Sequence, residues 1–199
     1  MKKTPVFEYY TETVMIQLTL PDGGEREVEI TPGVAFGRGF HPTTKLCIKA
    51  LERIFSDGDS DNHAPKKVLD VGCGSGVLSI CASLLGAEEV AGLDIDHMIV
   101  SEALDNVSAN AQSSKVKIVL GSIEDIEGAF DLITANVLIG SMLPMSEEIA
   151  SRVKPGGRLL LSGIKDEESD TVIERFSSHG LRLLKKDVER EWTAILLKK

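Results

Sequence analysis

Three glycines at alternate positions, Gly72, Gly74 and Gly76, follow a short apolar run that contains Asp70. A second apolar run ends at Asp94. Glycine lets a backbone approach a ligand closely, and a carboxylate at the end of a strand can accept hydrogen bonds from both hydroxyls of a ribose. This layout predicts a nucleotide-type pocket at the carboxyl ends of two parallel strands.

Two features favour S-adenosylmethionine over a dinucleotide as the ligand of this pocket. Dinucleotide-binding loops follow the spacing G-x-G-x-x-G, but Val77 stands where the third glycine would be. Asp70 would repel a pyrophosphate, whereas S-adenosylmethionine has no phosphate and carries an ammonium group that a carboxylate can meet. Asp94 suits either ligand. We therefore expect S-adenosylmethionine as the cofactor, with a dinucleotide site or a purely structural glycine turn as the alternatives.

Three further positions follow strands of the same pattern and are expected to bind the cofactor. Ile95 comes directly after Asp94. Ser122 and Ile123 come after the third strand, where position alone places the edge of the adenine ring. These assignments rest on the order of the strands and not on the chemistry of the side chains.

Asn136 comes directly after the fourth strand, at the expected mouth of the same pocket. Its side-chain carbonyl can accept a hydrogen bond from a substrate N–H, although the residue could instead cap the helix that follows. Methyl transfer from a sulfonium to an amine needs in-line alignment and a neutral nitrogen lone pair. A dry pocket with carbonyl acceptors provides both, because desolvation disfavours the ammonium form. In the first interpretation Asn136 is a catalytic residue that orients an amine, and no dedicated general base is required.

These residues are positioned by an alternation of short apolar strands and longer helices. Strands separated by helices indicate βαβ units and a parallel sheet. The expected strands cover 67–71, 90–93, 116–120, 132–135 and 158–162, and the expected helices cover 77–85, 97–111, 140–153 and 167–179. Two more strands, 181–188 and 192–197, form a final antiparallel hairpin. The pattern predicts the α/β class I S-adenosylmethionine-dependent methyltransferase (Rossmann-like) fold, with a mostly parallel seven-stranded sheet.

The segment before the first of these strands has a different pattern. Apolar residues alternate loosely over 6–30 around Pro21-Asp22-Gly23-Gly24, which predicts a β-hairpin or two short strands. A loop rich in glycine and proline follows, and Thr43 or Thr44 can cap a helix through roughly Ile54. Polar residues over 56–65 predict a surface loop, and the proline and glycines within 154–157 predict a turn. We expect one domain over 1–199, with a β extension and lid loop over 1–40 and the Rossmann-like core over 41–199.

Composition restricts the partners of this chain. A net charge of −9 repels a phosphate backbone, so a basic protein fits as substrate and we do not expect direct nucleic-acid binding. Cys47, Cys73 and Cys81 are odd in number and lack metal-ligand spacing, so we expect neither a disulfide framework nor a metal site. The absence of a signal peptide and of a membrane-spanning apolar stretch favours a cytoplasmic location without membrane contact. The sequence does not indicate an oligomeric state.

Several motifs together resemble the ribosomal protein L-eleven methyltransferase family, whose members methylate amino groups of a large-subunit ribosomal protein. The similarity covers roughly residues 30–199, and its most specific part is the pairing of the Phe36–Thr44 loop with Ala135-Asn136-Val137-Leu138. The other matching segments are Leu69–Gly76, Gly92–Asp96, Pro155-Gly156-Gly157, Leu161–Ile164 and Glu191-Trp192.

The resemblance implies cofactor contacts at Thr44, Gly72, Asp94 and Asn136. It also implies that the loop that begins at Phe36 closes over the methionine end of the cofactor. His41 is a tempting base, but its neighbour Pro42 favours a role in the architecture of the loop.

The chain departs from the family pattern in two respects. Arg38 and Phe40 stand where the family usually has small polar residues. The family also has a separate N-terminal domain that holds the ribosomal protein, and only a short segment precedes the loop here. The identity of the substrate therefore does not follow from the resemblance.

The leading hypothesis is an S-adenosylmethionine-dependent N-methyltransferase that acts on amino groups of a protein. The alternatives are methylation of a small metabolite and a cofactor-binding module without catalysis. Methylation of RNA ranks lowest, because Val137 and Leu138 follow Asn136 where enzymes that modify bases place aromatic residues for stacking.

Overall fold

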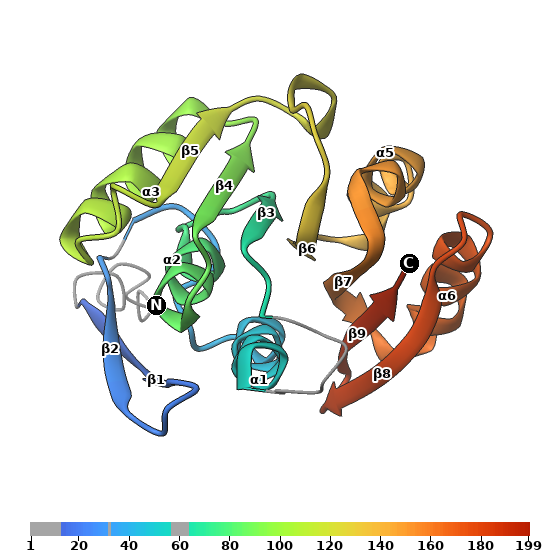
Figure 1. The fold of residues 1–199 in the computed structure, drawn as a ribbon, viewed down its shortest axis with the longest axis horizontal. Helices are drawn as coiled ribbons and strands as arrows, with labels where there is room; N and C mark the ends of the chain where they lie inside the picture. The colour runs from blue at the N-terminus through green and yellow to red at the C-terminus, as the bar shows by residue number, and fades with distance from the viewer. Residues whose placement is uncertain (1–12, 32, 57–63) are drawn as a thin grey trace, which may run out of the picture.

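The computed structural model describes residues 13–31, 33–56 and 64–199. Most of the expected loop over 56–65 and the start of the 6–30 segment lie outside these ranges. A seven-stranded sheet forms the centre of the molecule (Figure 1). Its strands, in spatial order, are β5 (Val116–Leu120), β4 (Glu89–Asp94), β3 (Lys67–Val71), β6 (Phe130–Asn136), β7 (Val153–Lys165), β9 (Trp192–Lys198) and β8 (Arg182–Glu189).

The sheet is parallel from β5 to β7 and antiparallel at β9 and β8. β9 lies between β7 and β8, although it follows both of them in the chain. The order reverses at β3, which pairs with β4 on one side and β6 on the other, and ligands of open α/β sheets bind at such a reversal. The predicted fold, with its mostly parallel sheet and final hairpin, is confirmed.

Helices cover both faces of the sheet. They are α1 (Pro42–Ser56), α2 (Val77–Leu85), α3 (His97–Ala109), α4 (Ile139–Met142), α5 (Ser146–Arg152) and α6 (Ser169–Ser177), with 3-10 turns η1 (Ile123–Asp125) and η2 (Asp166–Glu168). Successive strand residues belong to different core clusters: Val68 packs with α1 and α2, and Leu69 packs with α5 and α6. This alternation follows from the two-residue period of a strand.

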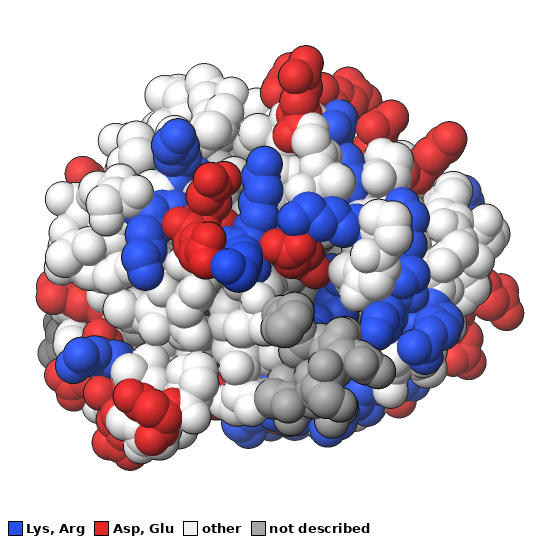
Figure 2. All heavy atoms as spheres, viewed as in Figure 1, with Lys and Arg blue, Asp and Glu red and all other residues white. Residues whose placement is uncertain are grey.

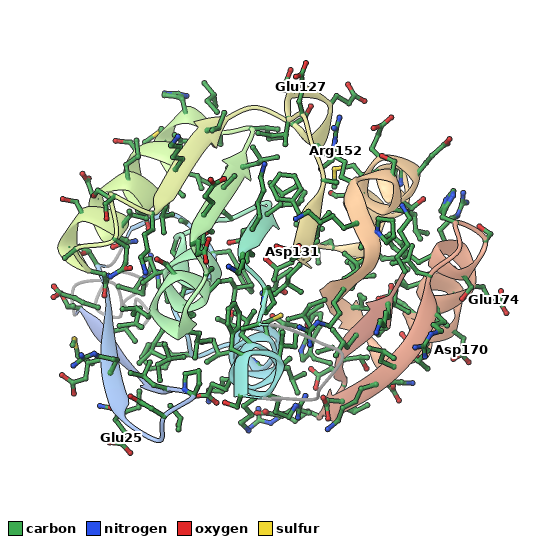
Figure 3. All side chains as sticks on the ribbon, viewed as in Figure 1. Glu25, Glu127, Asp131, Arg152, Asp170 and Glu174 are labelled. Carbon is green, nitrogen blue, oxygen red and sulfur yellow. The ribbon has the colours of Figure 1, made fainter. Side chains whose placement is uncertain are left out.

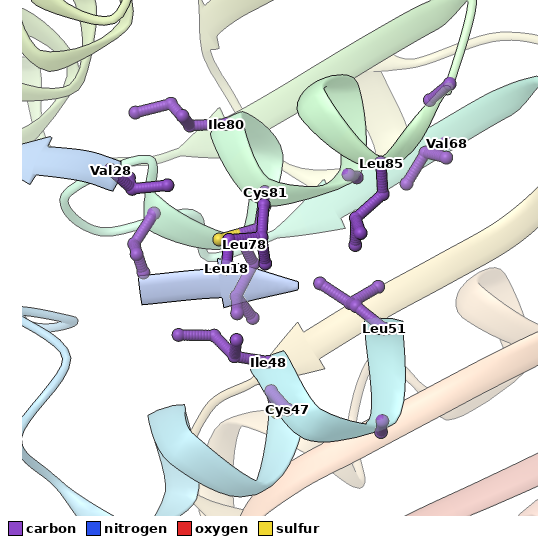
Figure 4. Close-up of a cluster of buried hydrophobic side chains, with 14 of the residues drawn as sticks. Leu18, Val28, Cys47, Ile48, Leu51, Val68, Leu78, Ile80, Cys81 and Leu85 are labelled. Atoms are coloured by element: carbon purple, nitrogen blue, oxygen red, sulfur yellow. The ribbon is translucent and has the colours of Figure 1, made fainter. Parts of the chain in front are cut away.

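A separate two-stranded sheet packs against the first of these cores. It consists of β1 (Val14–Thr19) and β2 (Glu25–Ile30), which pair antiparallel, so the predicted hairpin is present. Leu18 and Val28 are fully buried and lie in the same cluster as Leu51 of α1 and Ile80 of α2 (Figure 4). The hairpin thereby anchors the start of the loop that leads to α1.

Apart from shifts of a few residues at the ends of other elements, three expectations differ from the structure. α1 begins at Pro42, so Thr43 and Thr44 lie inside the helix and neither caps it. The helix expected over 140–153 is divided into α4 and α5, because Pro144 between them has no N–H to donate and its ring clashes with the preceding turn. The turn expected over 154–157 is instead the irregular start of β7.

Asp131 ties together the amino-terminal ends of three strands, at the opposite end of the sheet from the carboxyl ends. Its Oδ2 accepts the backbone N–H of Lys67 at 2.8 Å, and Lys154 Nζ lies 2.7 Å from its Oδ1. Asp131 is labelled in Figure 3. Partial burial raises the pKa of Asp131, but these hydrogen bonds outweigh it and hold the pKa below the usual 3.8. By contrast, Glu25 and Glu174 point outward from the edges of the molecule (Figure 3).

Positive side chains gather near β8 on the face shown in Figure 2, where acidic side chains are interspersed with them. Several of these charges are paired within the chain. Arg53 and Lys185 both pair with Asp187, and Lys186 Nζ lies 2.7 Å from Asp166 Oδ1. In the described ranges, no helix is long and apolar enough to cross a membrane.

Candidate active site

A cavity of about 580 Å³ opens at the carboxyl ends of β3, β4 and β6. Its volume lies within the usual range of about 300–1,000 Å³ for cofactor sites. Nine of the ten residues expected at the site line it: Phe36, Asp70, Gly72, Gly74, Asp94, Ile95, Ser122, Ile123 and Asn136. Thr44 does not line the cavity, and its neighbour Thr43 does. The fold therefore brings five separate segments of the sequence to one place.

The glycine loop follows β3 and leads into α2. Gly72, Gly74 and Gly76 have φ angles of 68°, 55° and 79°, which favour glycine over residues with a side chain. A Cβ on Gly74 would lie 2.5 Å from the carbonyl oxygen of Phe36, and one on Gly72 would lie 2.5 Å from Val137 Cγ1. The glycines thus make room for two other walls of the cavity as well as for a ligand.

Asp94 stands at the end of β4 and is partly exposed. Its Oδ2 accepts the N–H of Gly74 at 3.2 Å, and its Oδ1 accepts the N–H of Asp96 at the same distance. Each carboxylate oxygen has a further lone pair available for a donor. These contacts fix the carboxylate against the glycine loop and leave it able to accept hydroxyl groups.

Asp70 is buried beneath the cavity, with 1% of its surface exposed. Thr134 Oγ1 donates to its Oδ1 at 2.7 Å, and Ser79 Oγ donates to its Oδ2 at 2.8 Å. Burial raises the pKa of Asp70, although the hydrogen bonds from Thr134 and Ser79 oppose this change. The carboxylate therefore holds β3, β6 and α2 together, and its expected contact with a ligand ammonium stays a prediction.

Asn136 is the last residue of β6 and has a buried acceptor without a donor. Its Oδ1 is inaccessible to solvent and has no hydrogen-bond partner among the described residues. It does not cap the following helix, because the residue at the N-cap of α4 is Leu138. An unpaired buried carbonyl costs about 1–3 kcal/mol, so a ligand N–H that reached it would relieve this penalty. This observation fits an amine-bearing ligand.

His41 has an architectural position at the start of α1. Its carbonyl accepts the N–H of Lys45 at 3.1 Å, and its Nδ1 lies 2.8 Å from Thr43 Oγ1. His41 also lines the cavity. Thr44, which is expected to touch the cofactor, follows Thr43 in the helix and is fully buried. Its Oγ1 has no hydrogen-bond partner among the described residues.

A polar face of α3 holds the loop that carries Phe36. Glu102 Oε2 accepts the N–H groups of Val34 and Ala35 at 2.8 and 3.1 Å. One turn further, Asn106 Oδ1 accepts the N–H of Thr31 at 2.9 Å. Residues four apart lie on the same side of a helix, so one face of α3 contacts the loop at successive points.

The same face also reaches the glycine loop and the hairpin. Asn106 Nδ2 donates to the carbonyl oxygen of Ser75 at 2.9 Å, and the N–H of Ser75 donates to the carbonyl oxygen of Phe36 at the same distance. Asn110 exchanges two hydrogen bonds with the backbone of Glu29. The loop over the cavity is therefore tied to the glycine turn beneath it.

Several cavity residues have no role in the sequence-based prediction of the site. Trp192 enters from β9, and Ser141 and Met145 enter from the region of α4 and α5. The motif Glu191-Trp192 marks this segment in the sequence but does not place it near the glycine loop. The three cysteines are buried and free, and burial raises the pKa of Cys47 to about 12, so they are inert thiols.

Comparisons with known proteins place this fold and site in a family. The model of the ribosomal protein L11 methyltransferase (PrmA) family matches residues 11–199. The ribosomal protein L11 methyltransferase of Geotalea uraniireducens is 41% identical over 177 residues, which cover 86% of this chain and 56% of that protein. The one from Exiguobacterium is 38% identical over 196 residues, which cover 98% of this chain and 58% of that protein. The chain thus spans little more than half the length of these relatives.

Solved structures agree with these matches. A ribosomal protein L11 methylase from Lactobacillus delbrueckii superimposes with a TM-score of 0.75 at 26% identity, over 99% of this chain and 90% of that chain. The 16S rRNA N2 G1207 methyltransferase of T. thermophilus, solved with AdoMet and guanosine, has a TM-score of 0.72 at 22% identity, which shows a common fold. The resemblance noted in the sequence is confirmed, and the chain belongs to the ribosomal protein L11 methyltransferase family.

Proposed function

We propose that this chain is an S-adenosylmethionine-dependent N-methyltransferase domain that acts on amino groups of a basic protein, with a ribosomal protein such as L11 as the first candidate. The observation that carries the proposal is the unpaired, buried Oδ1 of Asn136 in the cavity that Gly72 and Asp94 also line. The names of the relatives and the net charge of −9 favour a basic protein as acceptor. We place the activity in the cytoplasm.

The residues of the cavity would divide the binding of the cofactor among them. Asp94 would accept the ribose hydroxyls, and Ser122 and Ile123 would border the adenine ring. When bound, S-adenosylmethionine supplies an activated methyl group on a sulfonium. Phe36, held above the glycine loop by the carbonyl contact to Ser75, would cover the reacting end and exclude water.

Asn136 would orient the acceptor nitrogen. Its Oδ1 accepts an N–H of the neutral amine, which directs the nitrogen lone pair toward the methyl group. The surrounding lining is largely apolar, with Val137, Leu138 and Val77 among its members, and this environment disfavours an ammonium. The amine therefore loses its proton to solvent before the acceptor is enclosed, and no side-chain base is needed.

Calorimetry with S-adenosylmethionine tests the cofactor site. Asp94→Ala should weaken binding by about 1.5–3 kcal/mol, or about 10-fold to 150-fold, because it removes hydrogen bonds to a charged group. Asp96→Ala is the matched control: this carboxylate is exposed, does not line the cavity and caps α3. The assignment of the pocket is wrong if the two variants bind the cofactor equally well.

A second assay tests the acceptor. Purified ribosomal protein L11 is incubated with the chain and methyl-labelled cofactor, and the modified nitrogen is located by mass spectrometry. Asn136→Ala should lower turnover more than it lowers cofactor affinity. The same incubation is repeated with a cell lysate. Label found there in small molecules and in no protein would contradict the proposal of a protein acceptor. Cofactor binding with no methyl transfer to any acceptor would indicate a binding module.

A further inference from the structure

The carboxylate of Glu102 in α3 is enclosed by part of the loop before α1, residues 33–37, which we call the lid segment. Its Oε2 accepts the N–H groups of Val34 and Ala35 at 2.8 and 3.1 Å. A Cβ on Gly33 would lie 2.0 Å from the carboxylate carbon, so the carboxylate occupies the space that a side chain would need there. The lid segment is thus fitted around one carboxylate.

The lid segment depends on polar contacts because its two large side chains are not buried in a core. Val34 is 74% exposed and Phe36 is 52% exposed. At the other end of the segment, Ser75 donates its N–H to the carbonyl of Phe36 and its Oγ–H to the carbonyl of Gly37, both at 2.9 Å. Glu102 and Ser75 therefore hold the lid segment from two sides, with Phe36 between them at the wall of the cavity.

The contact of Glu102 with the lid segment is incomplete. Its Oε1 is inaccessible to solvent and has no hydrogen-bond partner among the described residues. A buried acceptor without a donor destabilises the arrangement that buries it, and the effect is larger for a charged group. Movement of the lid segment away from α3 would let water reach this oxygen. The two hydrogen bonds at Oε2 thus favour the closed arrangement and the unpaired Oε1 opposes it, which suits a segment that opens and closes.

We propose that Glu102 is a positioning residue that holds the lid segment closed over the cofactor, and that loss of this contact opens the cavity. The inference rests on the proposed function and adds a step before and after methyl transfer. While the contact is made, Phe36 stays above the glycine loop and the cofactor is retained. When the contact breaks, the backbone that carries Phe36 moves away and the cofactor or its product leaves.

Removal of the carboxylate should shorten the time for which the cofactor stays bound. Labelled S-adenosylmethionine is bound to the chain and chased with an excess of unlabelled cofactor, and the retained label is followed by rapid filtration. Glu102→Ala should release the label about 10-fold faster, because hydrogen bonds to a charged group are lost. Asp105→Ala is the matched control: it removes the same charge from an exposed position on α3, and no hydrogen bond joins Asp105 to the described lid segment. It should release the label at the rate of the parent chain.

Gly33→Ala tests the contact from the side of the lid segment. Gly33 is not among the glycines with a positive φ, so alanine fits its backbone, and the added Cβ displaces the carboxylate of Glu102. The variant should therefore release the cofactor faster, as Glu102→Ala does. The double variant should release it no faster than Glu102→Ala alone, because no carboxylate remains to be displaced.

Two measurements on the ligand-free chain separate a local contact from a general loss of stability. The amide hydrogens of Val34 and Ala35 should exchange with solvent faster in Glu102→Ala than in the parent or in Asp105→Ala. Urea should unfold Glu102→Ala and Asp105→Ala at similar concentrations, because opening of the lid segment leaves the core intact.

The inference is refuted if Glu102→Ala releases the cofactor at the parent rate, if Asp105→Ala releases it equally fast, or if the effects of Glu102→Ala and Gly33→Ala add. It is also refuted if Glu102→Ala unfolds at a clearly lower urea concentration than Asp105→Ala, since the residue then supports the fold as a whole. Failure of the parent chain to bind S-adenosylmethionine would instead overturn the proposed function, and amide exchange at Val34 and Ala35 would still test the contact with Glu102.

Discussion

Replacing Asn106 by alanine should weaken both the fold and the cofactor site. The side chain of Asn106 is fully buried, and it joins the start of the loop that carries Phe36 to the glycine loop. Its Oδ1 accepts from Thr31 and its Nδ2 donates to the carbonyl of Ser75, both at 2.9 Å. We therefore expect Asn106→Ala to lower the free energy of unfolding and the affinity for S-adenosylmethionine together.

The size of the effect follows from the burial of the two partners. Each hydrogen bond contributes about 1 kcal/mol to stability, and a buried group left without a partner costs about 1–3 kcal/mol. Ser75 is fully buried, so its carbonyl would lose a donor with no direct access to water, whereas Thr31 is exposed and its N–H can bind water. The contribution of about 1 kcal/mol at Thr31 and that of about 1–3 kcal/mol at Ser75 add to a loss of about 2–4 kcal/mol.

Asn110→Ala supplies the matched control on the same helix. Its Oδ1 and Nδ2 bond the backbone of Glu29, which is only partly buried, so we expect a smaller loss of about 1–2 kcal/mol. It does not touch the glycine loop, and cofactor affinity should stay unchanged. Urea unfolding monitored by circular dichroism and calorimetry with the cofactor give both quantities. The reasoning fails if Asn106→Ala is no more destabilising than Asn110→Ala, or if it binds the cofactor as the parent does.

Two further substitutions test the floor of the cavity. Burial raises the pKa of Asp70 above 3.8. The folded chain therefore binds a proton at Asp70 more tightly than the unfolded chain does. As the pH rises from 3.8 through the folded pKa, ionisation of this carboxyl increasingly lowers the stability of the fold. The stability of Asp70→Asn relative to the parent should therefore increase over that range in urea titrations between pH 4 and 8, and a difference independent of pH would contradict the assignment. Gly74→Ala places a Cβ 2.5 Å from the Phe36 carbonyl at a φ of 55°, and it should lower stability by about 1–3 kcal/mol and also weaken cofactor binding. Gly23→Ala, at a φ of 83° with open space around it, carries backbone strain alone and should leave cofactor binding intact.

The elements with the clearest local signals were predictable to the residue. The expected bounds are found for two strands and one helix, Lys67–Val71, Val116–Leu120 and Val77–Leu85. Short apolar runs flanked by glycine or polar residues leave little choice of where an element begins and ends. The division between α4 and α5 carried a signal in Pro144 that the apolar pattern around it obscured. The start of β7 could not be read locally, since sheet pairing extended a segment whose residues favour a turn.

Much of the site was predictable because parallel strands deliver their carboxyl ends to one edge of the sheet. Its remaining parts depend on contacts between distant segments. The hydrogen bond from Thr134 to Asp70 requires the pairing of β3 with β6, and the residues next to Asp70 in the sequence do not encode that pairing. The meeting of Trp192 with His41 requires β9 to enter the sheet beside β7, a consequence of topology alone.

The position of β9 also orders events during synthesis of the chain. β8 emerges from the ribosome before β9, yet in the sheet β9 lies between β7 and β8 and pairs with both. Until β9 has been made, the outer edge of β7 has no neighbour and β8 has nothing to pair with. A nascent chain that already carries the glycine loop therefore lacks Trp192 and one wall of its cavity. The wall of the cavity is complete only when the last strand of the sheet is inserted.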